Sequence, residues 1–199
     1  MLRKSILVVA VLTPMIAGCH DSRAASNENF EKALQSHYDA HPVCVMLPVT
    51  FPVELSPSPM ESMRPQLDAL AKAGLLSTTT AQKPEPGKLA GYTSYSVSPT
   101  GKAVFRTDDE DFPGGTGLCF AKRKITKVES FTDPADLTGQ KVSRVTYDYT
   151  LVDVAPWATD VGIETAFPEI KVILAKPENQ QTDGMILTST GWKQERDIQ

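Results

Sequence analysis

The chain has 199 residues, about the size of one ordinary domain. Hydrophobic residues make up 41% and charged residues 22%, close to the average of soluble globular proteins, so we expect no disorder along the whole length. The 20 Lys and Arg residues against 24 Asp and Glu residues give a net charge of −4, which argues against a general nucleic-acid binder.

The first 19 residues have the parts of an export signal. A positive start, Arg3 and Lys4, precedes a mostly apolar run over residues 6–15, and small residues close the segment. The apolar run is shorter than the roughly 20 residues that a membrane-spanning helix needs, so we expect no retained helical anchor. The segment ends in Ile16-Ala17-Gly18-Cys19. This pattern of an aliphatic residue, two small residues and a cysteine resembles the lipobox of bacterial lipoproteins.

The lipobox resemblance implies a lipid anchor at Cys19. It implies diacylglyceryl transfer to the Cys19 thiol, removal of residues 1–18 as a signal peptide, and acylation of the new N-terminus. Two or more acyl chains anchor a protein stably, because each buried methylene group contributes about 0.8 kcal/mol. His20, rather than an aspartate, follows the cysteine, and by the same resemblance this favours the outer membrane, facing the periplasm. The alternative is an ordinary secretory signal that ends near a cysteine.

Two cysteines remain besides the one assigned to lipid. Cys44 and Cys119 form an even pair, and an exported protein reaches an oxidising compartment, so the sequence predicts a disulfide between them. Both lie in apolar, strand-like surroundings. The alternative is two buried free thiols. No second cysteine lies near either one, so the sequence gives no support for a redox-active pair.

The N-terminal half is predicted to be mixed in structure. Residues 19–25 are expected to form a lipidated tether, and residues 26–199 a single globular domain. Ser26 can cap a helix from Asn27 to about Tyr38, because serine oxygens accept from the first amides of a helix. The following segments are predicted from apolar periodicity and from proline and glycine positions: a broken strand over 43–55, a helix over 60–76, a polar link over 77–90, a strand over 92–97, a short helix over 99–105 and an acidic loop over 108–115.

The C-terminal half is predicted to be mainly β-structure. Residues 118–131 and 140–152 are long strand candidates, joined by a connection over 133–139. A helix over 162–175 is interrupted at Pro168, Asp183-Gly184 reads as a turn, and residues 185–195 read as a final strand. We therefore expect an α+β fold with N-terminal helices and an antiparallel sheet whose centre is formed by the two long strands.

Residues 60–105 resemble part of a winged-helix unit. The resemblance rests on a helix over 67–76 that ends in Gly-Leu-Leu and on the segment 95–103, which looks like a wing strand running into a following helix. The resemblance implies a DNA-reading unit in cytoplasmic proteins. Here the export signal and the charge favour a scaffold or protein-docking surface. The alternative is a plain helix, strand and helix within the α+β domain.

The sequence contains two clusters of candidate metal ligands, and neither is predicted to bind a metal. His37 and His41 are four apart, a spacing that can place two ligands on one helix face, but Pro42 ends the helix and no further ligand is evident. The acidic run 108–111 lacks the EF-hand pattern and reads as a solvated loop.

The basic residues of the strand 118–131 alternate between its faces and read as charges that guard a strand edge: Lys122, Arg123, Lys124 and Lys127.

A ligand groove lined by aromatic residues is the sequence's one candidate binding site. It would be formed by Tyr147, Tyr149, Trp157 and Trp192. The alternative is that these side chains belong to the core. No nucleophile, Ser-x-x-Lys or zinc-protease motif is present, so we expect no catalytic residues and no cofactor.

The sequence therefore predicts a lipid-anchored envelope protein with a non-catalytic role. Removal of residues 1–18 leaves 18 Lys and Arg against 24 Asp and Glu, a net charge of −6, so we expect no nucleic-acid partner. The expected contacts are the membrane, through Cys19, and a protein partner in the envelope, or the support of an envelope assembly. The alternative is a periplasmic module that binds a small molecule or lipid, or an unrecognised hydrolase. A deep pocket with converging polar groups would favour this alternative.

Overall fold

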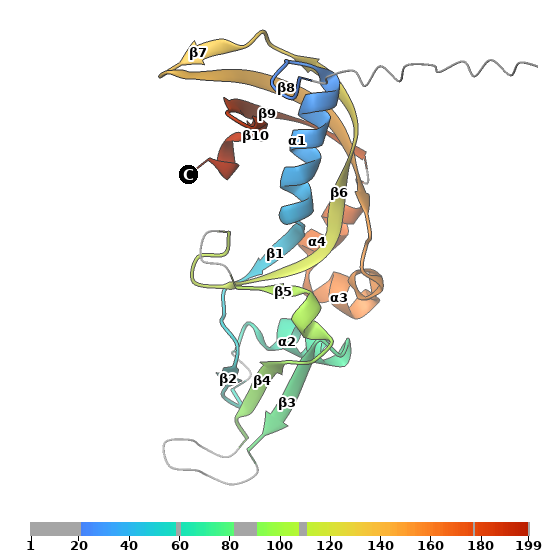
Figure 1. The fold of residues 1–199 in the computed structure, drawn as a ribbon. Helices are drawn as coiled ribbons and strands as arrows, with labels where there is room; N and C mark the ends of the chain where they lie inside the picture. Colours follow the sequence, from blue (N-terminus) through green and yellow to red (C-terminus); the bar gives the residue numbers. More distant parts are fainter. Residues whose placement is uncertain (1–20, 59–60, 82–90, 108–110, 177, 199) are drawn as a thin grey trace, which may run out of the picture.

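The structure is a computed structural model that describes residues 21–58, 61–81, 91–107, 111–176 and 178–198. Residues 1–18, predicted to be an export signal, lie outside these ranges, as do Cys19, His20 and the acidic residues 108–110, so what the sequence predicts for them stays a prediction. Within the described ranges the chain forms four α-helices, a seven-stranded antiparallel sheet and a three-stranded antiparallel sheet (Figure 1). The α+β fold with an antiparallel sheet is thereby confirmed.

Helix α1, Asn27–Ala40, begins where the sequence predicts. The Ser26 side chain accepts a hydrogen bond from the amide of Asn29 at 3.3 Å and so satisfies one of the free amides of the first turn. At the other end, the amide of His41 donates to the carbonyl of His37 at 3.0 Å, where the helix ends. The inner face of the helix buries Phe30, Leu34, His37 and Tyr38.

Residues 21–25, predicted as part of a tether, are held against the domain. The side-chain amide of Asn29 donates to the carbonyls of Asp21 and Ala24 at 2.8 and 2.9 Å. The indole nitrogen of Trp192 donates to the same Ala24 carbonyl at 3.1 Å. Side chains from α1 and from the last strand thus bind two backbone carbonyls within the described part of the predicted tether.

The large sheet has the order β1-β6-β8-β9-β10, with β5 paired to β6 and β7 paired to β8. Its two longest strands, β6 and β8, lie side by side at the centre, as predicted. The predicted connection between them contains a further short strand, β7, which forms a hairpin with the start of β8. The strands are β1 Val43–Leu47, β5 Phe105–Arg106, β6 Thr116–Phe131, β7 Ala135–Leu137, β8 Gln140–Val152, β9 Glu178–Thr188 and β10 Gly191–Gln194.

The end of the sheet differs from the prediction in one turn. Asp183 and Gly184 lie in the middle of β9, paired with β8, and do not form a turn. The turn between β9 and β10 lies at residues 189–190 instead, and Gly191 after it has a φ of +123°, which favours glycine. The Asp-Gly pattern was misleading because the aspartate is bound inside the strand by side chains distant in sequence.

The long strands β6 and β8 curve around α1, which packs on β6 and β10 (Figure 1). Strand β1 pairs with β6 only as far as Ala121. Beyond this point, Gln35 of α1 takes its place: its amide nitrogen donates to the carbonyl of Arg123 at 3.1 Å, and its oxygen accepts from the amide of Ile125 at 3.0 Å. The core enclosed between helix and sheet consists of Phe30, Leu34, Tyr38, Ile125, Val128, Val145, Tyr147, Met185 and Trp192.

A smaller unit follows β1 and leads back to β5. It consists of the three-stranded sheet β2-β4-β3 and helix α2, Arg64–Lys72. Its strands are β2 Val53–Leu55, β3 Leu76–Thr80 and β4 Thr93–Val97. The start of the predicted polar link is therefore strand β3, which pairs along its whole length with β4, and the rest of that link, residues 82–90, lies outside the described part.

The structure does not show a winged helix in this unit. The segment expected to be the following helix is a single 3-10 turn, Gly101–Ala103, which leads directly into β5. A Cβ atom at Gly101 would lie 2.1 Å from the carbonyl oxygen of Leu75, so glycine is required where this turn approaches the exit of α2. The alternative interpretation, a plain part of the α+β domain, describes this unit better.

Helices α3, Val161–Ala166, and α4, Pro168–Leu174, cover the lower part of the large sheet and contact α2 through α3 (Figure 1). Pro168 is the first residue of α4, so the predicted interruption of this helix is confirmed. These helices, the smaller unit and the start of β6 enclose a second core that includes Leu67, Leu70, Tyr95, Phe120, Ile163, Phe167 and Ile170. In the described ranges, every helix is too short or too polar to cross a membrane.

Candidate ligand-binding site

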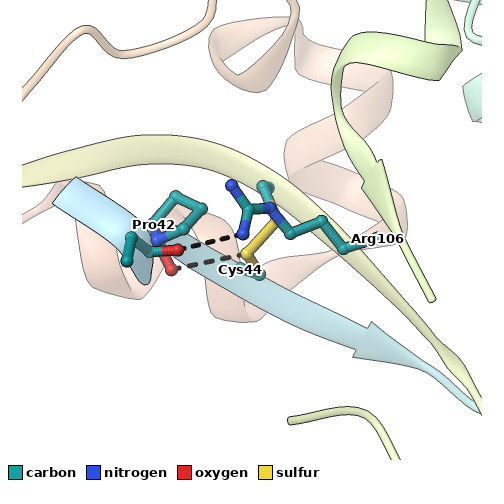
Figure 2. The surroundings of a disulfide bond; sticks show 5 residues. Pro42, Cys44 and Arg106 are labelled. Carbon is teal, nitrogen blue, oxygen red and sulfur yellow. Dashed lines mark hydrogen bonds between the residues drawn. A yellow bond between two sulfur atoms is a disulfide. The ribbon is translucent and has the colours of Figure 1, made fainter. Parts of the chain in front are cut away.

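The predicted disulfide joins Cys44 of β1 to Cys119 of β6, and these residues lie opposite each other in the sheet. Figure 2 shows the bond with Arg106 beside it. The guanidinium group of Arg106 donates to the carbonyl of Ala40, the last residue of α1, at 3.0 Å. The disulfide and this hydrogen bond together fix the junction between α1 and β1.

A cavity of about 620 Å³ opens at this junction. Its walls come from the end of α1, the start of β1, strands β6 and β8, helix α4 with the residues after it, and Arg196 near the C-terminus. Apolar side chains line one part of it, among them Val43, Leu151 and Ile173. Such a volume, with apolar walls and a few polar groups, is typical of small-molecule sites.

The charged side chains of the cavity are mainly cationic. Arg123, Lys176 and Arg196 line it, against the single carboxylate of Asp111. Two histidines, His37 and His41, stand at its rim on the end of α1. The permanent charges in the wall therefore favour an anionic group over a cationic one.

Arg123 is the cation with the most unusual surroundings. Its guanidinium carbon lies 4.8 Å from the ring centre of Tyr38 and 5.4 Å from that of Tyr149, so it stacks on two aromatic faces. Its Nε is buried and has no hydrogen-bond partner among the described residues. Charged donors left without an acceptor are costly in a protein interior. The arginine is thus held in place by aromatic rings and by no carboxylate of the described chain.

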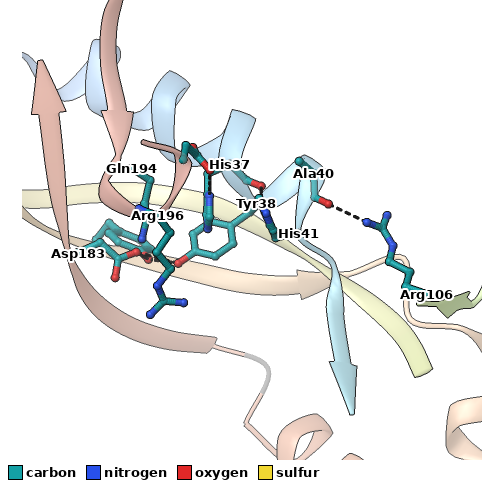
Figure 3. A network of polar contacts seen from close by, with 10 residues as sticks. His37, Tyr38, Ala40, His41, Arg106, Asp183, Gln194 and Arg196 are labelled. Carbon is teal, nitrogen blue, oxygen red and sulfur yellow. Dashed lines mark hydrogen bonds and ion pairs between the residues drawn. The ribbon is translucent and has the colours of Figure 1, made fainter. Parts of the chain in front are cut away.

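Beside Arg123 lies a buried network of two tyrosines and one aspartate (Figure 3 shows Tyr38 and Asp183). The hydroxyls of Tyr38 and Tyr147 donate to Oδ2 of Asp183 at 2.9 and 2.7 Å, and Gln181 donates to the other oxygen at 3.0 Å. Burial alone would raise the pKa of Asp183, but the hydrogen bonds from the two tyrosines and Gln181, with the charge of Arg196, lower that pKa below its usual value. Asp183 is therefore ionised at neutral pH, and both oxygens of its carboxylate accept hydrogen bonds.

The tyrosines of this network are poor proton donors to solvent. Burial raises the pKa of Tyr38 to about 12, against the lowering effects of the neighbouring Tyr147 hydroxyl and of Arg123. Burial also raises the pKa of Tyr147 above its usual range, and the adjacent Tyr38 hydroxyl and the Asp183 carboxylate act in the same direction. Both phenols stay protonated at neutral pH, so the network supports structure and offers no acid or base near neutrality.

A second polar cluster lies at the C-terminal end of α1. His37 is buried, and its Nδ1 lies 2.7 Å from Oδ1 of Asp197, in the 3-10 turn that follows β10. The ring of His41 stacks on that of His37 with centres 4.3 Å apart, and its Nδ1 donates to the carbonyl of His37 at 2.8 Å. The sequence pattern gave the two histidines but could not give Asp197, which is 160 residues from His37.

The four aromatic residues predicted to form a groove do not come together. Tyr147 and Trp192 are buried in the core between α1 and the sheet, and Trp157 packs against the second core. Only Tyr149 lines the cavity. The groove prediction was wrong because three of these rings pack in or against the two cores. The alternative, that the aromatic side chains belong to the core, describes these three residues.

The basic residues of β6 lie beyond Ala121, where β6 pairs with β8 on one side and its other side is no longer paired with β1. Lys122 pairs with Asp153 at 3.0 Å and Lys127 with Glu129 at 2.8 Å, both in exposed positions. Arg123 lies on the opposite face from Lys122, next in alternation to buried Ala121 and Ile125. The alternation of the sequence separates Lys122 and Lys124 from Arg123, but it also places Lys127 with Arg123, whereas a register shift between Ile125 and Lys127 leaves Lys127 exposed and buries Val128.

A comparison of the chain with models of protein families, with curated proteins and with solved structures gives no match. The function is therefore argued from the cavity and its charges.

Proposed function

We propose that the protein is a lipid-anchored protein of the bacterial cell envelope that binds a small ligand carrying an anionic group in the cavity between α1, the large sheet and α4. The observation that carries this proposal is the guanidinium group of Arg123, which lies over the rings of two tyrosines, has a buried Nε without a partner in the described chain and lines the cavity. An anionic ligand in the cavity would accept hydrogen bonds from the guanidinium N–H groups that face it.

The chemistry of the walls supports a ligand with two parts. Lys176 and Arg196 add positive charge near Arg123, and arginine binds carboxylate, sulfonate or phosphate groups through paired hydrogen bonds. Val43, Leu151 and Ile173 offer apolar surface in the same cavity. The ligand is therefore an amphipathic anion, with an apolar body beside these side chains and its charged group at Arg123.

The anchor and the location belong to the same proposal. The lipobox resemblance at residues 16–19 supports acylation of Cys19, and the Cys44–Cys119 disulfide supports an oxidising compartment such as the periplasm. Binding of an envelope protein remains a second prediction of the sequence. The cavity favours the small-molecule alternative over binding of an envelope protein, because a pocket with polar groups in its wall is typical of small-molecule sites.

The test uses a pair of fluorescent probes that differ in one group. 1-Anilinonaphthalene-8-sulfonate has an aromatic body and a sulfonate, and N-phenyl-1-naphthylamine has a similar body without the charge. We expect the purified protein to bind the sulfonate more tightly than the neutral probe. Arg123→Gln should weaken sulfonate binding by roughly 10- to 100-fold, since a charged hydrogen bond contributes about 1.5–3 kcal/mol.

Arg144→Gln is the matched control, because Arg144 is exposed on β8 and is not part of the cavity wall. It should leave the affinity unchanged. Thermal unfolding of each variant separates lost binding from lost folding. Equal affinity for the two probes, or equal behaviour of Arg123→Gln and Arg144→Gln, would overturn the proposed anion site.

A further inference from the structure

We propose that His37, His41 and Asp197 form a binding site for a divalent transition-metal ion such as Zn²⁺ at the rim of the cavity. This inference goes beyond the proposed function, since it concerns a metal ion and not the anionic ligand. It rests on the position of three side chains that come from the two ends of the described chain and meet at the C-terminal end of α1.

The distances are close to those that a bound ion requires. One ligand atom from each of the three side chains lies within 4.8 Å of the other two. Zinc binds nitrogen and oxygen ligands at about 2.0–2.2 Å, which places two tetrahedral ligands about 3.4 Å apart. The site must therefore close by about 1.4 Å at most. His37 is buried and fixed, whereas His41 is half-buried and Asp197 is exposed near the end of the chain, so the latter two can move.

His41 is prepared for metal binding by its hydrogen bond. Its Nδ1 donates to the carbonyl of His37, so its proton is on Nδ1 and Nε2 carries the free electron pair in the neutral ring. Such a hydrogen bond from a ring nitrogen to a carbonyl is typical of metal-bound histidines, because it fixes the tautomer and the orientation of the ring. The carboxylate oxygen 2.7 Å from Nδ1 of His37 belongs to Asp197, so an ion bound by both residues would take the place of this contact.

The types of ligand point to a transition metal. Two imidazoles and one carboxylate suit Zn²⁺ and related ions, whereas Ca²⁺ and Mg²⁺ prefer sites made only of oxygen. Both cysteines of the described chain are bonded to each other and are not available as ligands. Within the described ranges, no other three His, Cys, Asp or Glu side chains converge in this way.

The site leaves one coordination position open. Three protein ligands fill three of the four positions of a tetrahedral ion, and both histidines line the cavity. With two neutral imidazoles and one carboxylate, the bound ion would keep a net positive charge. The fourth position would hold a water molecule.

The experiment measures metal binding directly. The purified full-length protein is treated with a chelator, dialysed and titrated with Zn²⁺ by calorimetry, without any anionic ligand. Co²⁺ is then added as a spectroscopic probe, because its visible absorption reports the ligands and the geometry. We expect one Zn²⁺ per chain, and a Co²⁺ spectrum typical of four-coordinate nitrogen and oxygen ligands. Failure of anion binding would leave this result untouched, and the reverse also holds.

The variants target the two movable ligands, since replacing buried His37 puts folding at risk. His41→Ala and Asp197→Asn should each weaken Zn²⁺ binding by at least 10-fold, with unchanged thermal unfolding in the absence of metal. His20→Ala is the matched control, because it removes the remaining histidine of the chain, and it should bind Zn²⁺ as the unmodified protein does. The proposal is overturned if the protein binds no Zn²⁺ below about 100 μM, or if His41→Ala binds it as tightly as the control.

Discussion

The hydroxyl oxygens of Tyr38 and Tyr147 lie 2.5 Å apart, although the two residues are separated by 109 positions in the sequence. Tyr38 belongs to α1 and Tyr147 to β8, and both hydroxyls are bound by the same oxygen of Asp183 on β9. One buried carboxylate thus joins the helix to two neighbouring strands. The ring of Tyr38 also contacts the guanidinium group of Arg123, so the joint supports a residue that lines the cavity.

Removal of one phenol should weaken this joint measurably. Tyr147→Phe takes one donor from Asp183 and leaves the buried carboxylate less well bound, which should lower the free energy of unfolding by about 1–3 kcal/mol. Urea unfolding followed by circular dichroism measures the change. Tyr92→Phe is the control, since the hydroxyl of Tyr92 binds no described residue. A Tyr147→Phe variant as stable as this control would contradict the stabilising role of the network.

The ionised Asp183 predicts a loss of stability in acid. Its pKa in the folded protein is lowered from 3.8, so the unfolded chain takes up the proton more readily. The contribution of Asp183 is complete above the unfolded pKa and is lost as the pH falls through the folded pKa. We expect the unfolding temperature of the unmodified protein to exceed that of Asp183→Asn at pH 7, and the gap to narrow below about pH 4. A gap that stays constant from pH 7 to 3 would show that the charge contributes nothing.

The Cys44–Cys119 disulfide should contribute strongly to stability. The bond closes a separation of 75 residues, and in the chain-entropy model a loop of this length stabilises the fold by about 4 kcal/mol. We expect a reducing agent, or the double substitution Cys44→Ala and Cys119→Ala, to lower the urea midpoint by a corresponding amount. The double variant should then no longer respond to the reducing agent. A midpoint that does not move on reduction would mean that the purified protein lacks the bond.

The lipid anchor predicted at Cys19 can be tested by mass. We expect the protein extracted from bacterial membranes to have the mass of residues 19–199 plus its acyl chains, and two mass units less before reduction than after it. Cys19→Ala should abolish the acyl increment and prevent processing by the lipoprotein pathway. A membrane-extracted protein without acyl chains would contradict the anchor, and the fold and cavity would then belong to a secreted protein.

Local patterns in the sequence predicted those elements whose cause is local. Ser26 caps α1, Pro168 separates α3 from α4, and the alternating residues of β8 give a strand with the predicted bounds. The prediction failed where distant residues decide the structure. Asp183 lies within a strand, against its turn preference, because Tyr38 and Tyr147 bind it. No local pattern carries that information.

The candidate site was harder to predict for the same physical reason. Arg123 looked like one more charge in a basic segment, and its stacking depends on Tyr38, which is 85 positions away along the chain. The spacing of four residues identifies His37 and His41 as a pair, but their partner Asp197 lies 160 positions from His37 in the sequence. Spacing rules detect ligands on one element, whereas a site assembled from a helix, a strand and a terminal turn leaves only fragments in the sequence.

If Cys19 is lipidated as predicted, the binding of residues 21–25 to the domain would orient the protein on the membrane. With Asn29 and Trp192 holding the carbonyls of Asp21 and Ala24, only His20 separates the proposed lipidated cysteine from the folded chain. Two residue steps span at most about 7 Å. The end of the molecule with the start of α1 would therefore rest on the bilayer surface, and the three-stranded unit at its far end would point outward (Figure 1). Such a short linker would restrict the rotation of the domain relative to the bilayer. The cavity would therefore keep a nearly constant height and orientation above the lipid.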